Sequence, residues 1–372
     1  MDNERNWKRT LLAVVDTVTQ PLIAVLISFL LGAVVILVIG KNPLLAYGEM
    51  IRGAFGKQVY LMNTLKRATP IIMGGLAVCM AWRSGYEAMG GEGQMILGAV
   101  AAALVGYYLP VPGWLRIPVA MLAAAAAGAL YSAFSGWLFE KFDVTFVIST
   151  LMMNYIANYF AANLCNYPLR DPEANVYQMQ NAQTGKLPTE ATLPPIMKGW
   201  VHWGFVLAVI AVIVTLFLFK KTSFGYKSRM GGLNPWFALY GGINAWRMLY
   251  LVMVLSGVMA GLGGAFEVMG SKGRYVDQMI FSTGYAWTGM VAALLANMNP
   301  VGTLLASILL AGLAVGGSTM MLNMDIPLEV CNIIEGIITL FMSAKMIRIA
   351  AGNMRRRKQA KGGAEAGCTL PR

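Results

Sequence analysis

The stretch PLIAVLISFLLGAVVILVIG, residues 21–40, decides the class of fold. It carries no charged side chain, and it is long enough to cross the roughly 30 Å hydrocarbon core of a bilayer, which takes about 20 apolar residues in a helix. The apolar region of a signal peptide is shorter, about 7 to 15 residues, and is followed by a small-residue cleavage site that does not stand out here. We therefore predict that residues 21–40 form a retained first membrane span and that the protein is not secreted.

The composition of the whole chain also indicates a membrane protein. Of its 372 residues, 57% are hydrophobic and 12% are charged, whereas soluble domains carry about 25% charged residues. Apolar segments of span length recur along the chain, so we expect an all-α integral membrane fold with about ten transmembrane helices. The expected spans are residues 21–40, 65–81, 92–109, 115–139, 144–165, 200–219, 247–267, 283–297, 301–316 and 329–347.

Two of the expected spans are irregular. Residues 283–297 are short for a span, and they either cross the bilayer or re-enter it, which is tolerated only where protein or water covers the backbone. Pro70 lies inside the second expected span, where a proline removes a helical hydrogen bond and predicts a kink or a break.

The distribution of Lys and Arg predicts the orientation, because basic loops stay on the cytoplasmic side. The end of the chain and the loop after the sixth span are both basic, and an even number of spans places them on the same side as the N-terminus. Residues 41–67 are an exception, since this segment is basic and would lie outside. We expect a cytoplasmic N-terminal segment at residues 1–20, a transmembrane domain at 21–347 and a basic cytoplasmic tail at 348–372. Within the transmembrane domain, we expect an external loop at 166–199 and a cytoplasmic loop at 220–246.

Several kinds of chemistry lack the residues they need. The four cysteines show no CxxC spacing, so we expect neither a disulfide framework nor a metal site, and no cofactor. No Gly-Lys pair is followed by Ser or Thr, so the chain does not hydrolyse ATP through a P-loop. We attribute the net charge of +12 to membrane topology and attraction to anionic lipid, not to nucleic-acid binding.

Two other classes of function stay open, although the sequence offers few of the residues that they need. An ion-coupled secondary transporter needs paired ionisable groups in mid-membrane, and the candidates Glu267 and Glu335 have no obvious basic partner in their own helices. An integral-membrane enzyme would need a nucleophile with a base, or a metal set. The one histidine, His202, lies beside Trp200 and Trp203, which is typical of an interfacial belt. A transporter driven by another subunit fits better.

The stretch GYEAMGGEGQMILGAVAAAL at residues 85–104 places Glu92 in the first turn of an expected helix. The exposed N–H groups and dipole of a helix start favour a carboxylate, so Glu92 either caps the helix or marks a half-helix beside a solute path. The spacing of Gly93 and Gly98, followed by a Val-Ala-Ala run, recurs at Gly284 and Gly289 on an expected span of opposite direction. This recurrence indicates an inverted internal repeat.

Uncharged polar residues within spans are the candidates for contact with a solute. Asn154 and Asn158 lie one turn apart in the fifth expected span, so both amides share a helix face. An amide in hydrocarbon needs a partner, which is either a neighbouring helix or a hydrated path. The candidate pathway residues are Glu92, Gln94, Asn154, Tyr155 and Asn158.

Small residues elsewhere favour helix packing. They lie four apart on one face of the fourth expected span, as Ala124, Gly128, Ser132 and Gly136. Gly257 and Gly261 repeat the spacing in the seventh span, and such faces let helices approach closely in a bilayer.

The stretch KKTSFGYKSRMGGLNPWFALYGGI at residues 220–243 is basic and contains helix-breaking residues. Pro235 suits the first turn of a helix and Gly241-Gly242 suits its end, which predicts a short helix over residues 235–240. Such a helix between spans is a docking element for another protein, although an ordinary cytosolic loop is the alternative.

Four motifs in order carry a family resemblance over roughly residues 60–345. They are GEGQ at 91–94, FVISTLMMNYIANYF at 146–160, SFGYKSRMGGLNPWFALYGGI at 223–243 and SGVMAGLGGAFEVMG at 256–270. Together they resemble the permease subunit of bacterial ABC importers for nucleosides and simple sugars, in the branched-chain-amino-acid/ribose-type superfamily. The resemblance implies a type II importer-like fold in the bacterial cell membrane.

The resemblance also implies partners and a division of labour. A separate cytoplasmic ATPase subunit hydrolyses ATP, a second permease subunit completes the channel as a homo- or heterodimer, and an extracytoplasmic solute-binding protein delivers the solute, so the chain itself is not an enzyme. Nucleosides are the first expectation because GEGQ and MMNY resemble the nucleoside branch, and simple sugars are the alternative. The loop after the sixth span would contact the ATPase through Arg229, Gly232, Asn234, Pro235, Ala238, Gly242 and Ile243. Trp236 and Phe237 are bulkier than the family pattern implies there.

Overall fold

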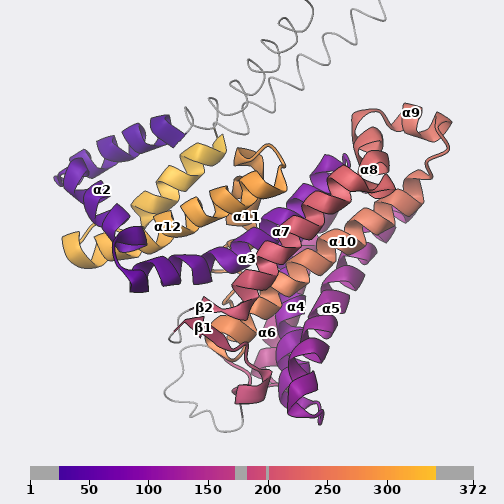
Figure 1. The fold of residues 1–372 in the computed structure, drawn as a ribbon, viewed down its shortest axis with the longest axis horizontal. Coiled ribbons are helices and arrows are strands. Elements are labelled where there is room, and N and C mark those ends of the chain that lie inside the picture. The colour runs from indigo at the N-terminus through magenta and orange to yellow at the C-terminus, as the bar shows by residue number, and fades with distance from the viewer. Residues whose placement is uncertain (1–24, 172–181, 198–200, 341–372) are drawn as a thin grey trace, which may run out of the picture. The chain divides into compact units, whose positions relative to one another are not determined.

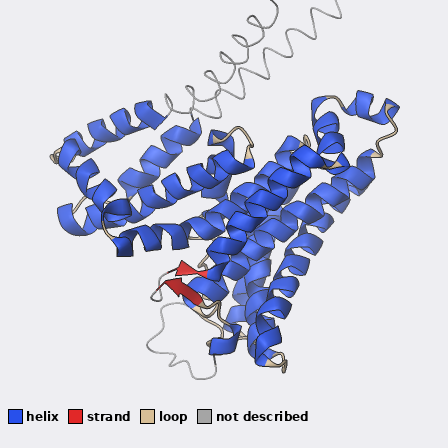
Figure 2. Cartoon of the chain, in the orientation of Figure 1, coloured by secondary structure: helices blue, strands red, loops and turns tan. Residues whose placement is uncertain are grey.

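The computed structural model describes residues 25–171, 182–197 and 201–340. The chain divides into two compact units, one formed by residues 44–328 and the other by the segments on either side of it. Helices dominate both units (Figure 2). The described residues include one small antiparallel sheet, in which β1 (Pro195–Met197) pairs with β2 (Val201–His202).

The larger unit is a helical bundle in which α8 and α9 lie at the opposite end of α10 from the small sheet (Figure 1). Three short irregular helices, η1 (Arg52–Gly56), η2 (Thr189–Ala191) and η3 (Glu267–Lys272), join the longer ones. The α-helices are α2 (Pro43–Ile51), α3 (Gln58–Arg83), α4 (Gly91–Tyr108), α5 (Gly113–Phe142), α6 (Phe146–Asn166), α7 (Trp203–Lys221), α8 (Ser223–Leu233), α9 (Pro235–Tyr240), α10 (Ala245–Phe266), α11 (Tyr285–Leu295) and α12 (Pro300–Met324).

Four of these helices are long and apolar enough to cross a membrane on their own: α5, α7, α10 continued by η3, and α12. This confirms an all-α, multi-pass membrane fold. Every expected span overlaps a helix wherever the structure describes it. The count of about ten spans stays a prediction.

The two irregular spans take different forms. The helix α3 runs through Pro70 without a break. The helix α11 has 11 residues, which at 1.5 Å per residue gives about 16 Å, roughly half the hydrocarbon thickness. It packs against α3 and α12, so protein covers its backbone as a re-entrant helix requires.

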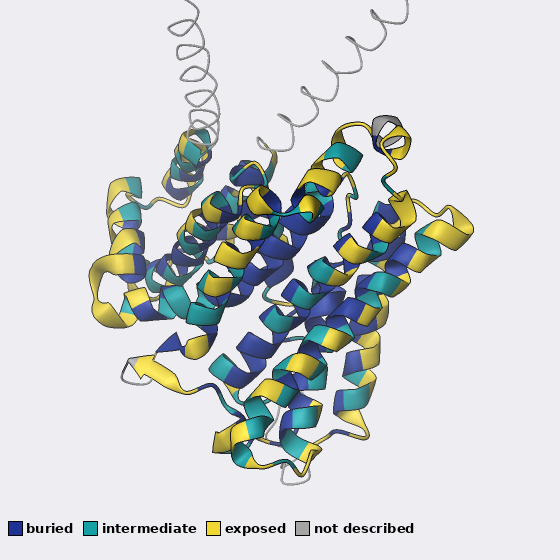
Figure 3. Cartoon of the chain, turned by 45° about the vertical axis from the view of Figure 1, so that its right-hand side comes forward, coloured by how far each residue is buried: buried dark blue, intermediate teal, exposed yellow. Residues whose placement is uncertain are grey.

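The core of the larger unit lies along α3, α4 and α10, which carry long runs of buried residues, and buried segments gather in the interior of the described helices (Figure 3). The expected small-residue packing is confirmed where α5 crosses α10. A Cβ on Gly128 would lie 2.9 Å from the Cα of Gly261, and a Cβ on Gly257 would lie 2.7 Å from the Cβ of Ser132. No larger side chain fits between these backbones.

The two glycine-bearing stretches of the sequence repeat make equivalent crossings. A Cβ on Gly98 of α4 would lie 2.5 Å from the Cα of Gly261 in α10. A Cβ on Gly289 of α11 would lie 2.7 Å from the backbone nitrogen of Gly75 in α3. Each of these two helices therefore crosses the long helix that belongs to the other copy, which is the exchange that an inverted repeat produces and supports that prediction.

Parts of the structure were not expected from the sequence. Residues 43–56 form α2 and η1, and residues 223–233 form α8, although both segments were interpreted as loops. Thr222 caps α8 by accepting a hydrogen bond from the backbone N–H of Gly225 at 3.4 Å. The basic and glycine-rich composition of α8 hides this helix, because glycine has low helix propensity and no apolar stripe is present.

The smaller unit includes a helix over Val25–Val38 and a helix over residues 329–340. Ile36 lies buried on the first of these helices, and Ile334 and Ile338 lie buried on the second. The expected N-terminal segment 1–20 and the basic tail 348–372 lie outside the described residues. Residues 21–24 of the first expected span and residues 341–347 of the last one also lie outside them.

Candidate translocation and coupling sites

The segment between α3 and α4 is held by two side chains of α6. The backbone N–H of Met89 donates to Thr150 Oγ1 at 3.0 Å. Asn154 Nδ2 donates to the carbonyl of Met89 at 2.9 Å, and Asn154 Oδ1 accepts from the backbone N–H of Gly93 at 2.9 Å. Asn154 is 2% exposed and uses both ends of its amide on this segment. It therefore positions the start of α4.

The start of α4 meets the start of α11. Glu92 lies in the first turn of α4 and is 3% exposed, and Trp287 Nε1 donates to its Oε2 at 3.0 Å. The positive ends of two helix dipoles therefore lie near one carboxylate, which favours negative charge there. A cavity of about 10 Å³ beside this contact is lined by Glu92, Ala286 and Met290 among others, and it has room for about one water molecule. The contact between Glu92 and Trp287 therefore joins the start of α4 to the start of α11.

Gln94 on α4 and Asn158 on α6 each have a buried amide oxygen without a hydrogen-bond partner among the described residues. The two oxygens are Gln94 Oε1 and Asn158 Oδ1, and both residues are buried. Asn158 Nδ2 makes one long contact, 3.5 Å, to Oε1 of Gln278 in the turn before α11. Buried amide oxygens of this kind are free to accept hydrogen bonds from water or from a hydroxyl-rich solute.

Tyr155 lies on another face of α6 from the two asparagines. Its side chain is 49% exposed, and its ring centroid lies 5.9 Å from that of Phe281. The exposed face continues along α6 through Met152, Ile156, Tyr159 and Phe160. The structure thus brings Glu92, Gln94 and Asn154 together around the start of α4 and separates Tyr155 from them.

The predicted short helix is present as α9, Pro235–Tyr240, and its C-terminus explains three of the expected coupling residues. Gly242 has a φ of +74°, its N–H donates to the carbonyl of Leu239 at 3.0 Å, and the N–H of Ile243 donates to the carbonyl of Ala238 at 3.0 Å. This pair of bonds is a Schellman motif, which needs a left-handed residue at Gly242 and an apolar contact between the residues at Ala238 and Ile243.

The end of α8 is seated against the turn that follows α3. Ser84 and Ser228 share a hydrogen bond of 2.5 Å between their hydroxyls. A Cβ on Gly232 would lie 2.6 Å from the carbonyl oxygen of Arg83 and 3.0 Å from the nitrogen of Gly85. Gly232 is helical, so the constraint on it is this close approach of backbones, whereas Gly242 is left-handed.

An apolar cavity of about 260 Å³ lies beneath this seat. Ala238 and Ile243 line it from the end of α9, and Trp246 and Leu249 line it from α10. Ala238 is 5% exposed, so its side chain is covered by this chain. Among the described side chains of α9, Leu239 and Tyr240 are exposed, at 56% and 89%, and neither was expected as a coupling residue.

The other expected coupling residues are more accessible. Arg229, Gly232 and Asn234 are exposed along the end of α8. Pro235 begins α9, as the sequence predicts, and its side chain lies outside what the structure describes.

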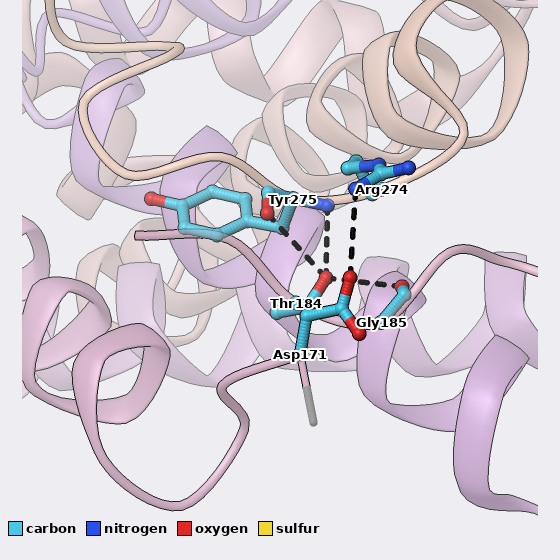
Figure 4. A network of polar contacts seen from close by, with 5 residues as sticks. All are labelled: Asp171, Thr184, Gly185, Arg274 and Tyr275. Carbon is cyan, nitrogen blue, oxygen red and sulfur yellow. Dashed lines mark hydrogen bonds and ion pairs between the residues drawn. The ribbon is translucent and has the colours of Figure 1, made fainter. Parts of the chain in front are cut away.

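The described part of the expected external loop is bonded to the turn between η3 and α11 (Figure 4). The N–H of Thr184 donates to the carbonyl of Tyr275 at 2.9 Å, and the N–H of Tyr275 donates to Thr184 Oγ1 at 3.0 Å. Asp171 forms an ion pair with Arg274, with 3.6 Å between Oδ2 and the nearer guanidinium nitrogen. The loop and this turn therefore form one connected structure.

The single histidine caps α7. His202 is buried, and its Nδ1 accepts a hydrogen bond from the backbone N–H of Gly204 at 3.1 Å. Burial, with a smaller contribution from the positive charge of Lys66, lowers the pKa of His202 to about 4, so the imidazole is neutral at physiological pH. Gly204 of α7 and Gly270 of η3 lie against the ring, and the expected position in an interfacial belt stays a prediction.

Comparisons with known proteins show the family of this chain. Residues 60–343 match the family described as branched-chain amino acid transport system / permease component. The chain belongs to this permease family. The permease is 34% identical to the guanosine ABC transporter permease protein NupP of Bacillus subtilis, over 91% of this chain and 96% of that protein.

Two further relatives show how solute names vary within similar sequences. The permease is 31% identical to the glucose ABC transporter permease protein TsgB13 of Haloferax volcanii, over 87% of this chain and 86% of the relative. It is 30% identical to the nucleoside ABC transporter permease protein NupB of Lactococcus lactis, over 89% and 92% respectively. Permease components are transport subunits of ABC transporters, so this permease is a multi-pass membrane protein that transports and is not itself an enzyme.

Proposed function

We propose that this permease is the transmembrane subunit of an ATP-driven importer that moves nucleosides into the cell. The observation that carries the proposal is the 34% identity to a guanosine permease along almost the full length of both chains. The buried amide oxygens of Gln94 and Asn158 suit a neutral, hydroxyl-bearing solute. Simple sugars are the second candidate, favoured by the 31% identity to a glucose permease.

In the proposed assembly, the loop at residues 220–246 contacts a cytoplasmic ATPase subunit. Arg229, Asn234 and the exposed side chains of α9 form the contact surface. Ala238, Gly242 and Ile243 hold α9 in shape through the Schellman motif. The external loop at residues 166–199 faces a solute-binding protein, and both termini lie in the cytoplasm. A second permease subunit completes the pathway against the exposed face of α6 that includes Tyr155.

The contacts support a route from the ATPase to the solute path. The turn at residues 83–85 touches α8 through Gly232 and through the Ser84–Ser228 bond. The chain then runs directly into Met89 and Glu92, which Asn154 holds in place. A displacement of α8 and α9 therefore shifts the start of α4 and separates Glu92 from Trp287. In the proposed mechanism this separation opens the path during each ATP cycle.

Uptake by the reconstituted transporter tests the proposal. The permease is purified with its ATPase subunit and solute-binding protein and placed in proteoliposomes with ATP inside or outside. We expect labelled guanosine or uridine to accumulate only when ATP reaches the ATPase, with unlabelled nucleosides competing and glucose competing weakly. Accumulation driven by an ion gradient without the ATPase would instead indicate a secondary transporter, and preferential competition by glucose would select the sugar alternative.

A variant pair tests the coupling loop separately. Ala238→Glu places a carboxylate in the apolar cavity under α9, so it unseats the helix and reduces retention of the ATPase or its solute-stimulated hydrolysis. Removal of residues 355–372 leaves the loop intact and serves as the control. If the loop variant keeps the ATPase and its stimulation while the truncation loses both, coupling belongs to the tail.

A further inference from the structure

A second cavity, of about 430 Å³, lies on the other side of α8 from the apolar one. It is lined by the end of α3, the end of α7, the last turn of α8 and the residues that precede α12. Its lining residues are Arg83, Leu216, Phe219, Lys220, Arg229, Gly232, Leu233, Asn297, Met298, Asn299 and Pro300. The cavity shares Arg83, Arg229 and Gly232 with the coupling route described above, whereas Lys220 and the residues at the start of α12 lie outside that route.

The charges around this cavity are unbalanced. Arg83, Lys220 and Arg229 come from three different helices, and the described lining residues include no acidic side chain. None of these three cations forms an ion pair with a described residue. Arg229 is close enough for its charge to repel that of Arg83, and the Arg83 guanidinium is held 4.5 Å from the centre of the Phe219 ring. Clustered cations without a counter-charge are stabilised by a bound anion.

The backbone adds to the positive potential of the cavity. Asn299 is the N-cap of α12, where its Oδ1 accepts from the N–H of Val301 at 3.2 Å, and Pro300 is the first helical residue. Both line the cavity, so the positive end of the α12 dipole lies at its wall.

An apolar helix face leads to this cavity. On α7, Ile213 and Phe217 are each 59% exposed, and Lys220 follows on the same face one turn later. The apolar stripe suits acyl chains, and the cations at its end suit a headgroup phosphate. Free phosphate would make no use of the stripe.

We infer that this cavity binds the phosphate group of an anionic phospholipid whose acyl chains lie along the exposed face of α7. Basic pockets at the ends of membrane helices bind such headgroups. The site is separate from the solute path, and in the proposed orientation it belongs to the cytoplasmic leaflet. Because Gly232 lines the cavity, a lipid bound there would lie next to the contact between α8 and the turn at residues 83–85.

Native mass spectrometry of the purified full-length permease in neutral detergent tests the inference. The probes are dioleoylphosphatidylglycerol, dioleoylphosphatidylcholine with the same chains, and inorganic phosphate. We expect preferential retention of phosphatidylglycerol by the wild type. Lys220→Gln should weaken that binding about five-fold, because each basic residue near an anionic surface contributes about that factor. Lys220→Arg should restore it.

The matched control is Lys227→Gln, which removes an exposed cation of α8 that does not line the cavity. This variant should bind phosphatidylglycerol as the wild type does. Equal retention of both lipids, equal loss in the two Gln variants, or Lys220-dependent binding of inorganic phosphate with no lipid preference would each overturn the inference. So would displacement of the lipid by added ATPase subunit alone, since the cations would then belong to the protein interface.

Discussion

Two asparagines one helical turn apart should respond very differently to the same substitution. Asn154→Leu removes the acceptor for the N–H of Gly93 and the donor to the carbonyl of Met89, both at 2.9 Å. Asn154 is 2% exposed, so these backbone groups stay buried and unpaired. Each unpaired buried group costs about 1–3 kcal/mol, which gives a loss of about 2–6 kcal/mol in the free energy of unfolding. We expect a clearly lower melting temperature and lower uptake.

Asn158→Leu is the matched control. This side chain makes a single contact, of 3.5 Å, and its Oδ1 has no partner among the described residues. Its replacement should therefore change the free energy of unfolding by less than about 1 kcal/mol, because little hydrogen bonding is lost. If Asn158 accepts a hydrogen bond from the solute, uptake should fall while stability is kept.

Both variants are measured by fluorescence-detected size-exclusion chromatography after heating, and by nucleoside uptake corrected for the amount of permease in the membrane. Insertion should be normal in both, since leucine makes the span more apolar. The reasoning is refuted if Asn154→Leu melts at the wild-type temperature, or if Asn158→Leu is the less stable of the two. Normal uptake by Asn158→Leu would remove that residue from the solute path.

Three further outcomes follow from the structure. Gly232→Val should abolish coupled uptake, because its side chain would collide with the backbone at residues 83–85, whereas Gly231→Ala meets open space and should not. His202→Asn should keep the α7 cap but remove an acid-sensitive step. With a folded pKa near 4 and an ordinary value of 6.5, the wild type loses about 1.4 kcal/mol of stability per pH unit as the pH falls between those values, which apparent melting temperatures at several pH values would show. A cysteine placed within residues 175–190 should react with an impermeant maleimide from outside, and one placed within residues 355–365 should not; the reverse pattern contradicts the orientation.

Local sequence signals predicted the features that depend on a few neighbouring residues. The short helix α9 was predicted because Pro235 and Gly242 fix the backbone at its two ends. The close-packing faces of α5 and α10 were predicted because Gly128 and Gly257 lie on faces of repeated small residues, whereas the structure shows that these two faces meet each other. These patterns act through backbone sterics, which the sequence states directly.

Features that depend on distant partners could not be predicted in this way. The sequence could not say whether the amide of Asn154 faces a solute or a helix, because its partners lie about 60 residues earlier in the chain. The inward position of Ala238 depends on α10, and the partner of Glu92 is Trp287 of α11. The one available signal for Trp287 was its place within the glycine repeat.

The meeting of Glu92 and Trp287 connects the two ends of the permease. From one side, the segment that carries Glu92 leaves the turn seated on α8. From the other side, the segment that carries Trp287 leaves the turn that bonds to the external loop at Thr184. Both segments are held by hydrogen bonds and close glycine contacts. A displacement at one end of such a segment is therefore passed on to the other end and is not absorbed by loose packing.

A change at either end therefore has a short covalent path to the same contact. In the proposed importer, binding of a partner at the expected external loop displaces the turn before α11, and ATP-driven movement of the coupling loop displaces the turn before α4. Because α4 crosses α10 and α11 crosses α3, the predicted inverted repeat gives the two displacements equivalent positions relative to the Glu92–Trp287 contact. In the proposed importer, this equivalence lets solute delivery on one side and ATP hydrolysis on the other act on one gate.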